Sequence, residues 1–556
     1  MLIGLTGWRM WGVAAISGAI SALAMAPFHM APVLLLTLPV LLGLTRPDVF
    51  GVSADAAVPS AADVPDPAIS GLGATVVSRM RRGFTAGWWF GFGYHFAGLY
   101  WIGGAFLVQA DSYAWLLPAA VTLMPAGLAL FFGAATAACA ALPDRWIDPR
   151  MGFVLCLSAA EVLRGTILTG FPWNSLGYAL AWPLPLMQAA SVVGIYGLTV
   201  LAIVIAVFPL TLYVQGRRQN ARRPAIVAGL ALVIPVGVLA TFGGVRLAMD
   251  NVPDVPDVRV RLVQPSVPQA DKWRQDRQPA IFRQHLDLTR QRPDGGTDDL
   301  SGITHVMWPE AAMPFGPLAS PSAIAAVREA LPDGTVLLAG LLRAERDRRG
   351  LPTRIFNSAV AFEHTGRVQA LYDKIHLVPF GEYLPFQQTL EWLGLEAVTR
   401  QRGGFAAGRR PRQLMEISGL PRTEMLICYE VVFPQGVGRG AVRPQLFVNL
   451  TNDGWFGVTS GPYQHLHQAQ VRAVENGVPL LRVANNGVSA VVDAFGRIRH
   501  SLDLNVVGTI DSNVPAALPQ TIYSAAREAV FVVIWGLLLL AGVLSRSLSK
   551  PCSDIA

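Results

Sequence analysis

The sequence has few charged residues, almost no lysine, and only four cysteines. Of its 556 residues, 15% are charged and 52% are hydrophobic, and the mean hydropathy is +0.41. These values exclude an ordinary soluble protein of this length and indicate a polytopic membrane protein. The cysteines show no paired spacing, so the sequence offers neither a disulfide framework nor a zinc site. They are Cys139, Cys156, Cys428 and Cys552.

Signals for bound cofactors, metals and nucleic acids are also missing. The pair Gly403-Gly404 is not followed by the Lys-Ser/Thr of a phosphate-binding loop. His465 and His467 would point to different faces of a helix, which argues against a shared metal ion. The sequence pI of about 9.4 reflects many arginines beside apolar segments, where membrane orientation explains them better than nucleic acid does. We therefore expect no cofactor, no metal and no nucleic-acid partner.

Charge divides the chain into unlike parts. It is sparse before about Asp250 and dense from there to about Arg499, so one part is suited to lipid and the other to water. This contrast predicts a transmembrane helical domain over residues 1–250, a water-exposed domain over 251–520, and a C-terminal span with a tail over 521–556. Eight apolar segments are predicted to be membrane spans. They cover residues 11–27, 31–44, 84–108, 113–142, 151–168, 186–214, 225–247 and 529–544.

Three features of the apolar part need an interpretation. The stretch at about 50–76 is rich in Ala, Pro, Asp and Ser, which predicts a flexible loop to which we assign no role. Ala24-Met25-Ala26 is similar to a signal-peptidase site, but the second apolar segment follows at once and favours an uncleaved anchor. Glu161 and Arg164 are three residues apart in the fifth segment, where they either neutralise each other or serve lipid or the water-exposed domain.

Basic residues predict the orientation of these segments. They gather in alternate loops, while the remaining short loops carry almost none, so the positive-inside rule places both termini in the cytoplasm. The domain after the seventh segment then faces outward. The residues that decide this are Arg46, Arg79, Arg81, Arg82, Arg145, Arg150, Arg217, Arg218, Arg222, Arg223, Arg546 and Lys550.

Three short stretches of the polar part bring reactive groups to the ends of expected strands. The apolar run 425–430 carries Cys428, and the strand before Trp308-Pro309 leaves Glu310 beyond its end. Between them, residues 372–383 alternate charged and apolar side chains, so Lys374 shares a face with other polar groups before a turn presents Glu382. A lone buried cysteine usually packs as a small hydrophobic residue, so only the presence of Glu310, Lys374 and Glu382 favours catalysis by Cys428.

The chemistry of a thiol nucleophile requires such a set. A thiol is mostly protonated at neutral pH, so Cys428 needs a base, and Glu310 is the candidate. The oxyanion formed on an attacked carbonyl needs a fixed charge and N–H donors, for which Lys374 and the backbone N–H of Tyr429 are available. Glu382 would orient the Lys374 ammonium. Of 44 basic residues, only Lys272, Lys374 and Lys550 are lysine, which favours a functional role for Lys374 over chance.

These residues resemble the catalytic Glu-Lys-Cys set of the nitrilase superfamily of carbon–nitrogen hydrolases. The match consists of Glu310 in Trp-Pro-Glu, Lys374 in Lys-x-His-Leu-Val-Pro-Phe-Gly-Glu-Tyr, and Cys428 in Cys-Tyr-Glu. With the segment Asn449-Leu-Thr-Asn-Asp-Gly-Trp-Phe-Gly457, the chain is similar over nearly its whole length to one branch, the bacterial apolipoprotein N-acyltransferases.

The resemblance sharpens the expected fold. Short β-branched runs alternate with amphipathic stretches from residue 258 onward, which indicates a layered α/β domain. The resemblance makes this an α-β-β-α sandwich with catalytic groups at strand ends. Strands are expected at 258–264, 303–308, 335–339, 356–362, 425–429, 445–450, 480–484 and 489–493, and helices at 279–291, 321–330, 385–392 and 463–476.

The resemblance also implies the reaction. An acyl chain would pass from a phospholipid, by resemblance phosphatidylethanolamine, through a Cys428 thioester to the N-terminal amine of a diacylated apolipoprotein. Tyr429 and Glu430 would shape the pocket. Trp273, Trp455 and Phe456 would contact substrate, and residues 386–399 would form an arm over the site. We expect a monomer in the bacterial inner membrane, with residues 251–520 in the periplasm.

Two other functions are compatible with the same residues. A membrane-tethered amidase would use the same set, although it has little need of eight spans. A transporter or sensor would bind ligand without catalysis, and its function would survive Cys428→Ser. The acyltransferase and the amidase differ in whether the Cys428 adduct is passed to an amine or only to water.

Overall fold

The computed structural model describes residues 5–52, 72–249, 252–296, 300–313, 320–385 and 404–548. The chain forms two compact units, one of Met1–Met249 with Ala525–Ala556 and one of Asp250–Ser524. The first unit is built from helices, and the second contains the β-strands that the structure describes.

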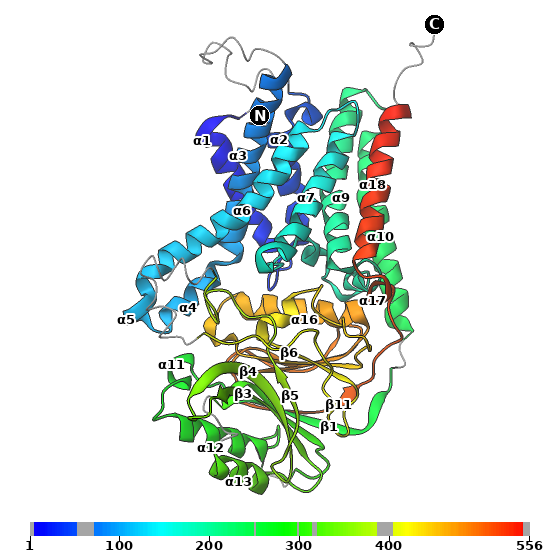
Figure 1. Cartoon of the computed structure of the whole chain (residues 1–556). Helices are drawn as coiled ribbons and strands as arrows, with labels where there is room; N and C mark the ends of the chain where they lie inside the picture. Colours follow the sequence, from blue (N-terminus) through cyan, green and yellow to red (C-terminus); the bar gives the residue numbers. More distant parts are fainter. Residues whose placement is uncertain are drawn as a thin grey trace. The chain divides into compact units, whose positions relative to one another are not determined.

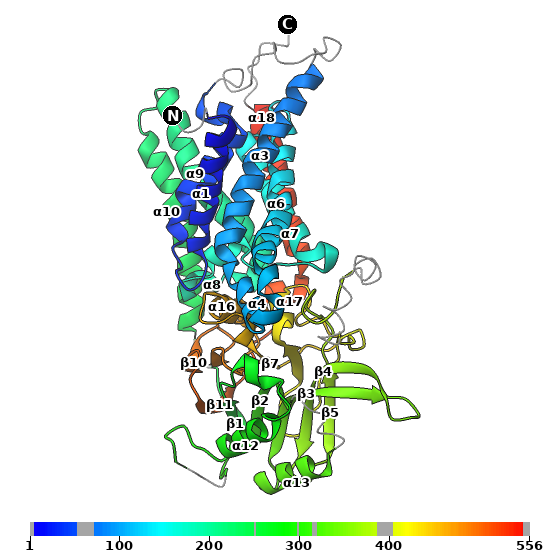
Figure 2. The same cartoon turned by 90° about the vertical axis from the view of Figure 1, so that its left-hand side faces the viewer.

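A helix lies at every predicted span of the first unit (Figures 1 and 2). Among the described helices, five are long and apolar enough to cross a membrane. They fall in Ala110–Ala141, Pro149–Thr169, Ala190–Arg218, Pro224–Ala248 and Glu528–Ser545. The count of eight spans therefore remains a prediction. The helices at the predicted spans are α1 (Gly7–Ser21), α2 (Leu34–Thr45), α3 (Leu72–Gly98), α6 (Leu117–Ala141), α7 (Pro149–Thr166), α9 (Ala190–Arg218), α10 (Pro224–Ala248) and α18 (Glu528–Leu548).

The third predicted span has the wrong ends. Helix α3 begins at Leu72, inside the loop predicted for 50–76, and ends at Gly98 rather than at residue 108. Hydropathy marks only the apolar part of a helix, whereas α3 continues through its arginines because Arg is a good helix former. After Gly98 the chain forms short helices instead, including α4 (Gly104–Leu107) and α5 (Ala110–Tyr113). The rest of the predicted loop, residues 53–71, lies outside the described residues.

Helices α3 and α6 approach closely because glycines replace side chains at their interface. Gly83, Gly87 and Gly91 recur every four residues on α3 and face α6. A Cβ at Gly87 would lie 2.0 Å from the Oγ1 atom of Thr136, and that hydroxyl is 2.8 Å from the carbonyl oxygen of Gly83. Small residues at such spacing let helices pack tightly where no hydrophobic force drives association.

The buried ion pair of α7 is internally satisfied. Arg164 Nη2 lies 2.8 Å from Glu161 Oε2, and both side chains are almost fully buried. Arg164 also donates to the Trp173 carbonyl, and Glu161 accepts from the Leu176 N–H. The two charges thus neutralise each other and hold the chain where it reverses after α7.

The second unit is a sandwich of two sheets between helices (Figures 1 and 2). One sheet has the order β11-β1-β2-β3-β4-β5, and the other has the order β10-β9-β8-β7-β6. Their strands are β1 (Asp254–Gln264), β2 (His305–Met313), β3 (Val336–Arg346), β4 (Pro352–Glu363), β5 (Val368–Asp373), β6 (Thr423–Ile427), β7 (Leu446–Thr451), β8 (Leu480–Ala484), β9 (Ser489–Val492), β10 (Ile498–Leu502) and β11 (Gly508–Pro515).

Two apolar layers hold this sandwich together. One contains side chains of both sheets, such as Leu262, Met307 and Val448, and therefore lies between them. The other lies between the first sheet and the helices α12 (Gln278–Thr289) and α13 (Pro321–Ala330). Helix α16 (Gly461–Asn476) packs against β8 of the second sheet. The α-β-β-α prediction is confirmed.

Most expected strands and helices of this unit are present. Strands β5, β10 and β11 are additional to those expected, and the expected helix at 385–392 and the arm at 386–399 lie outside the described residues, apart from Pro385. Strands β1, β2 and β3 run parallel, as do β6, β7 and β8. Parallel strands bring their carboxyl ends to one edge, and this edge carries the site.

Candidate active site

Cys428 stands at a strained turn between β6 and the short helix η13 (Cys428–Val432). Its φ of +51° lies in the left-handed region, which costs a residue with a side chain about 1–3 kcal/mol. Main-chain contacts on both sides hold the turn. The Ile427 N–H donates to Glu430 Oε2 at 2.8 Å, and the Cys428 carbonyl accepts from His465 Nε2 at 3.2 Å and from Asn449 Nδ2 at 3.4 Å.

Glu310, Lys374 and Glu382 meet in one buried cluster. Lys374 Nζ lies 2.8 Å from Glu382 Oε1 and 3.5 Å from Glu310 Oε1. Asn357, in the middle of β4, donates from Nδ2 to Glu310 Oε1 at 2.7 Å and to Glu382 Oε1 at 3.2 Å. Glu382 also accepts from the Val378 N–H at 2.8 Å. The ammonium and amide thus separate and fix two carboxylates that would otherwise repel each other.

The thiol of Cys428 is in electrostatic contact with this cluster. Burial raises the pKa of Cys428 to about 12, the Glu310 carboxylate adds to that rise, and the Lys374 ammonium and the Thr451 hydroxyl oppose it. The thiol is therefore protonated near pH 7 and needs a base to become a nucleophile. Glu310 is the carboxylate that acts on it most strongly.

Lys374 remains charged in this environment. Burial opposes its charge, but the carboxylates of Glu382 and Glu310 outweigh burial and raise the pKa of Lys374 above its ordinary value. The cluster therefore keeps a fixed positive charge beside a neutral thiol, as stabilisation of an oxyanion requires.

Glu430 joins the thiol turn to the segment that carries Lys374. Besides the Ile427 N–H, its carboxylate accepts from the N–H groups of Ile375 and His376 at 2.9 and 3.0 Å. The Arg412 guanidinium and the Tyr372 hydroxyl also donate to it. Burial opposes ionisation, but Arg412 and these donors lower the pKa of Glu430 below its usual value. The carboxylate is a buried link between these segments, and its predicted role in shaping the pocket stays a prediction.

The four predicted aromatic residues lie around the same edge. Tyr429 is buried, with its ring centroid 4.8 Å from that of Phe433. Trp273 follows the short helix α11 (Gln269–Lys272) and is half-buried, as are Trp455 in η14 (Asp453–Trp455) and Phe456 after it.

Reasoning from the sequence missed several polar residues of the site. Lys272 is fully buried and donates from Nζ to the Glu310 carbonyl at 2.8 Å. His465, which the sequence presents only as a weak metal candidate, contacts the Cys428 carbonyl instead. Asn357 could have been recognised as a lone amide within an apolar strand. Lys272 could have been recognised because lysine is rare in this chain, which is also the argument for Lys374.

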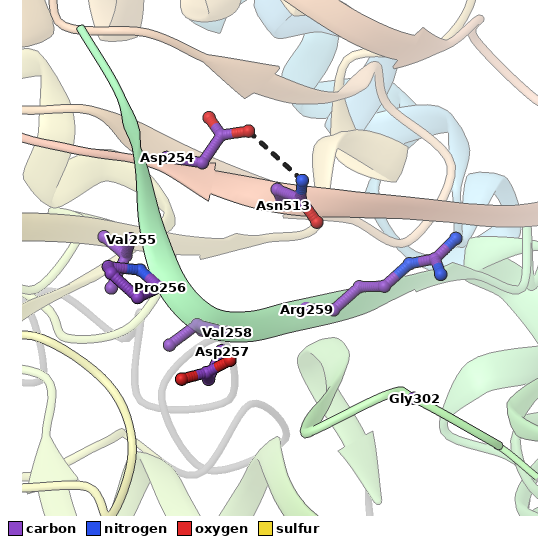
Figure 3. Close-up of a pocket in the computed structure, with 8 residues that line it drawn as sticks. All are labelled: Asp254, Val255, Pro256, Asp257, Val258, Arg259, Gly302 and Asn513. Carbon is purple, nitrogen blue, oxygen red and sulfur yellow. Dashed lines mark hydrogen bonds between the residues drawn. The ribbon is translucent and has the colours of Figure 1, made fainter.

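Two other kinds of site are of interest in the described residues: a metal site and a pocket. Groups of three or more His, Cys, Asp or Glu side chains that could hold a metal are absent from the described ranges. Figure 3 shows a pocket at the start of β1, where Asn513 donates to Asp254. It contains no predicted site residue and lies at the opposite end of β1 from the edge that carries Cys428.

Comparison with known proteins covers both units. The family model for the apolipoprotein N-acyltransferase N-terminal domain matches residues 67–208, and the carbon–nitrogen hydrolase model matches residues 259–522. An apolipoprotein N-acyltransferase of Rhodopseudomonas palustris is 41% identical over 543 residues, which is 97% of this chain and 96% of that protein. The chain belongs to the apolipoprotein N-acyltransferase family.

Other members of this family agree. Those of Bradyrhizobium diazoefficiens and Brucella melitensis are 42% and 40% identical, over 97% and 93% of this chain and 96% and 91% of their own length. Among solved structures, an amidase of Nesterenkonia with an acetamide moiety added at its active-site cysteine has 22% identity and a TM-score of 0.34. The match covers 51% of this chain and 100% of the amidase. The family models and the curated relatives make the chain an acyltransferase of the carbon–nitrogen hydrolase superfamily in a bacterial membrane.

Proposed function

We propose that this protein is an apolipoprotein N-acyltransferase that moves an acyl chain from a phospholipid to a lipoprotein through a thioester on Cys428. The observation that carries the proposal is the 41% identity over 97% of the chain, because it includes the helical unit as well as the catalytic unit. An amidase would need only the second. The buried thiol, carboxylate and ammonium supply the chemistry that this transfer requires.

In the first step, Glu310 accepts the proton of the Cys428 thiol as sulfur attacks the ester carbonyl of the lipid. The oxyanion that forms is held by the Lys374 ammonium and the Tyr429 N–H. The carbon–oxygen bond then breaks, Glu310 returns its proton to the departing alkoxide, and a lysophospholipid leaves. The acyl chain remains on sulfur.

In the second step, the N-terminal amine of a diacylated apolipoprotein attacks the thioester carbonyl. Glu310 accepts a proton from the amine nitrogen, and the same two donors hold the new oxyanion. The carbon–sulfur bond breaks, and the thiolate recovers the proton from Glu310. The products are an amide at the lipoprotein N-terminus and the free enzyme.

The donor, orientation and assembly belong to the same proposal. Phosphatidylethanolamine is the donor, Trp273, Trp455 and Phe456 contact the substrates, and the enzyme acts as a monomer. The basic residues in alternate loops support cytoplasmic termini and a periplasmic catalytic unit, where lipoproteins would be met.

The test follows the acyl chain. Purified protein is incubated with phosphatidylethanolamine vesicles, and mass spectrometry is expected to show an acyl mass on Cys428. Addition of a diacylated lipopeptide should discharge that mass and yield a triacylated peptide. Cys428→Ser should give no transfer.

Phosphatidylglycerol vesicles serve as the donor control. An adduct that is lost only to water would indicate a hydrolase. Transfer that survives Cys428→Ser would rule out the thioester.

A further inference from the structure

We infer that His465 is a positioning residue that aims the Tyr429 N–H at the oxyanion by holding the carbonyl of Cys428. The inference rests on the proposed function, because it concerns the tetrahedral intermediates of acyl transfer. The contact between His465 and the Cys428 carbonyl has no role in the proposed reaction steps. A fully buried imidazole on α16 contacts the main chain of the nucleophile rather than its sulfur.

The direction of this contact is unambiguous. His465 Nε2 lies 3.2 Å from the Cys428 carbonyl oxygen, and a carbonyl oxygen can only accept. Nε2 must therefore carry a proton in either charge state of the ring. Asn449 Nδ2, at 3.4 Å, is a second and longer donor to the same oxygen.

Peptide geometry transmits this contact to the next residue. The bond between Cys428 and Tyr429 belongs to a planar trans peptide, so the carbonyl and the following N–H point in opposite directions. Fixing the carbonyl on the α16 side fixes the Tyr429 N–H on the other side. A hydrogen bond to the carbonyl also polarises the peptide and makes its N–H a stronger donor.

The strained backbone makes such support necessary. With φ at +51°, the Cys428 turn would relax unless its surroundings held it. Glu430 accepts from the N–H of Ile427, the residue before Cys428, and His465 donates to the carbonyl of Cys428 itself. The two contacts bracket the nucleophile.

The imidazole is itself held from two other directions. Its Nδ1 lies 2.9 Å from Asp453 Oδ1 and 3.1 Å from Arg482 Nη2, and those two side chains are 2.7 Å apart. The Phe456 ring meets it edge to face, with centroids 6.0 Å apart. Such a ring has one orientation, as a positioning residue requires.

A matched pair of substitutions separates this role from support of the fold. The amide nitrogen of His465→Gln reaches to about the position of Nε2, so this variant keeps the donor to the Cys428 carbonyl. The shorter His465→Asn keeps a polar group near Nδ1, with its Asp453 and Arg482 contacts, but cannot reach the carbonyl. A role in the fold alone would favour Asn, whereas the positioning role favours Gln.

Two rates are measured for each variant. Acylation of Cys428 by phospholipid passes through an oxyanion, whereas alkylation of Cys428 by iodoacetamide displaces iodide and does not. We expect His465→Asn to lower kcat for acyl transfer about 100-fold, with KM little changed, because one misplaced oxyanion donor costs roughly that much. Alkylation should stay within about threefold of the wild type, and His465→Gln should transfer within about tenfold of it.

A spectroscopic signature completes the test. With a ¹³C-carbonyl acyl donor and no acceptor, the thioester carbonyl stretch of the acyl-enzyme should move to higher frequency in His465→Asn, because a weaker oxyanion donor polarises the bond less. Wild type that forms no acyl adduct would refute the proposed function. If the wild type does form the adduct, and His465→Asn has the same acyl-transfer rate and the same thioester carbonyl frequency as the wild type, this inference alone would be refuted. Parallel loss of alkylation, or loss of cooperative thermal unfolding in both variants, would also overturn it.

Discussion

The two sheets of the catalytic unit contribute to the site in different ways. The first sheet supplies side chains that bond to one another, since Glu310, Asn357 and the Lys374 that follows β5 form one network. The second sheet supplies a nucleophile whose main chain is held, through the contacts of Asn449 and His465 with the Cys428 carbonyl. In the proposed mechanism, charge and proton transfer would depend on the first sheet, and the geometry of the nucleophile would depend on the second.

Links between the sheets make the two halves one site. Glu430 reaches from the turn after β6 to the N–H groups of Ile375 and His376, beyond the end of β5. Substitutions on the first sheet should therefore affect chemistry with little effect on the fold, whereas removal of this link should affect both.

The largest effect is expected from the base of the first sheet. Glu310→Gln keeps the shape and the hydrogen bond with Asn357 but cannot accept a proton. Because general base catalysis contributes about 10²–10⁴-fold, acylation of Cys428 should fall by about 10³-fold, with a thermal unfolding temperature near that of the wild type. Acyl-adduct formation measured by mass spectrometry checks the rate. Glu345→Gln, a partly exposed glutamate of β3, is the control. If Glu310→Gln acylates Cys428 at a rate within tenfold of the wild type, Glu310 is not the general base.

Loss of the Glu430 link between the two sheets should lower the free energy of unfolding. In Glu430→Gln the Arg412 guanidinium loses the nearer of two carboxylates, Glu430 at 3.1 Å, and keeps Glu424 at 3.6 Å. An amide also faces N–H donors that it cannot all accept. Breaking a buried ion pair in this way costs about 3–5 kcal/mol. The unfolding temperature should fall by roughly 10 °C. Glu416→Gln, at an exposed position, is the control.

The pH dependence of this difference has a definite sign. Because the folded pKa of Glu430 is lowered, its stabilisation is present above the unfolded pKa and is lost as pH falls through the folded value. The gap between wild type and Glu430→Gln should therefore narrow in acid. Equal unfolding temperatures of the two at neutral pH would show that the sheets do not depend on this link.

The same contrast explains what the sequence could predict. Cys428 follows β6, and Glu310 lies within β2, which continues past the strand end predicted at residue 308. The apolar runs of these two buried strands are visible in the sequence, whereas Lys374 follows β5, which was not expected. Strands β5 and β10 are largely exposed, and their mixed side chains hide the alternation on which prediction depends.

The partners of these residues could not be inferred in the same way. Lys272 contacts Glu310 across 38 positions of the chain, and His465 contacts Cys428 across 37. Asn357 faces Glu310 only because the β4 register places it there. Such contacts depend on tertiary packing, which no local sequence pattern encodes. In the helical unit, hydropathy likewise missed the charged first turns of α3, which begins at Leu72 and not at residue 84.

The two buried lysines beside Glu310 provide the smallest and most specific test. Lys374 contacts carboxylates and its pKa is raised, whereas Lys272 donates to the main-chain carbonyl of Glu310. Burial lowers the pKa of Lys272 to about 8, although Glu310 and Cys428 oppose the shift. Two lysine side chains that both contact Glu310 should therefore have pKa values shifted in opposite directions, with Lys272 below and Lys374 above the ordinary value.

The neutral state of Lys272 stabilises the folded protein more as the pH rises. Between pH 8 and its ordinary pKa of 10.5, the unfolded chain binds a proton at Lys272 that the folded chain has released, so stability rises with pH. From pH 7 to 9.5 the wild type should gain about 2 kcal/mol relative to Lys272→Met, which has no proton to lose. Lys272→Arg, which stays charged, should behave like the Met variant in this respect. Parallel pH curves of unfolding temperature in all three proteins would show that Lys272 is as firmly charged as Lys374. The difference between a carboxylate partner and a carbonyl partner would then not decide the state of an ammonium at this site.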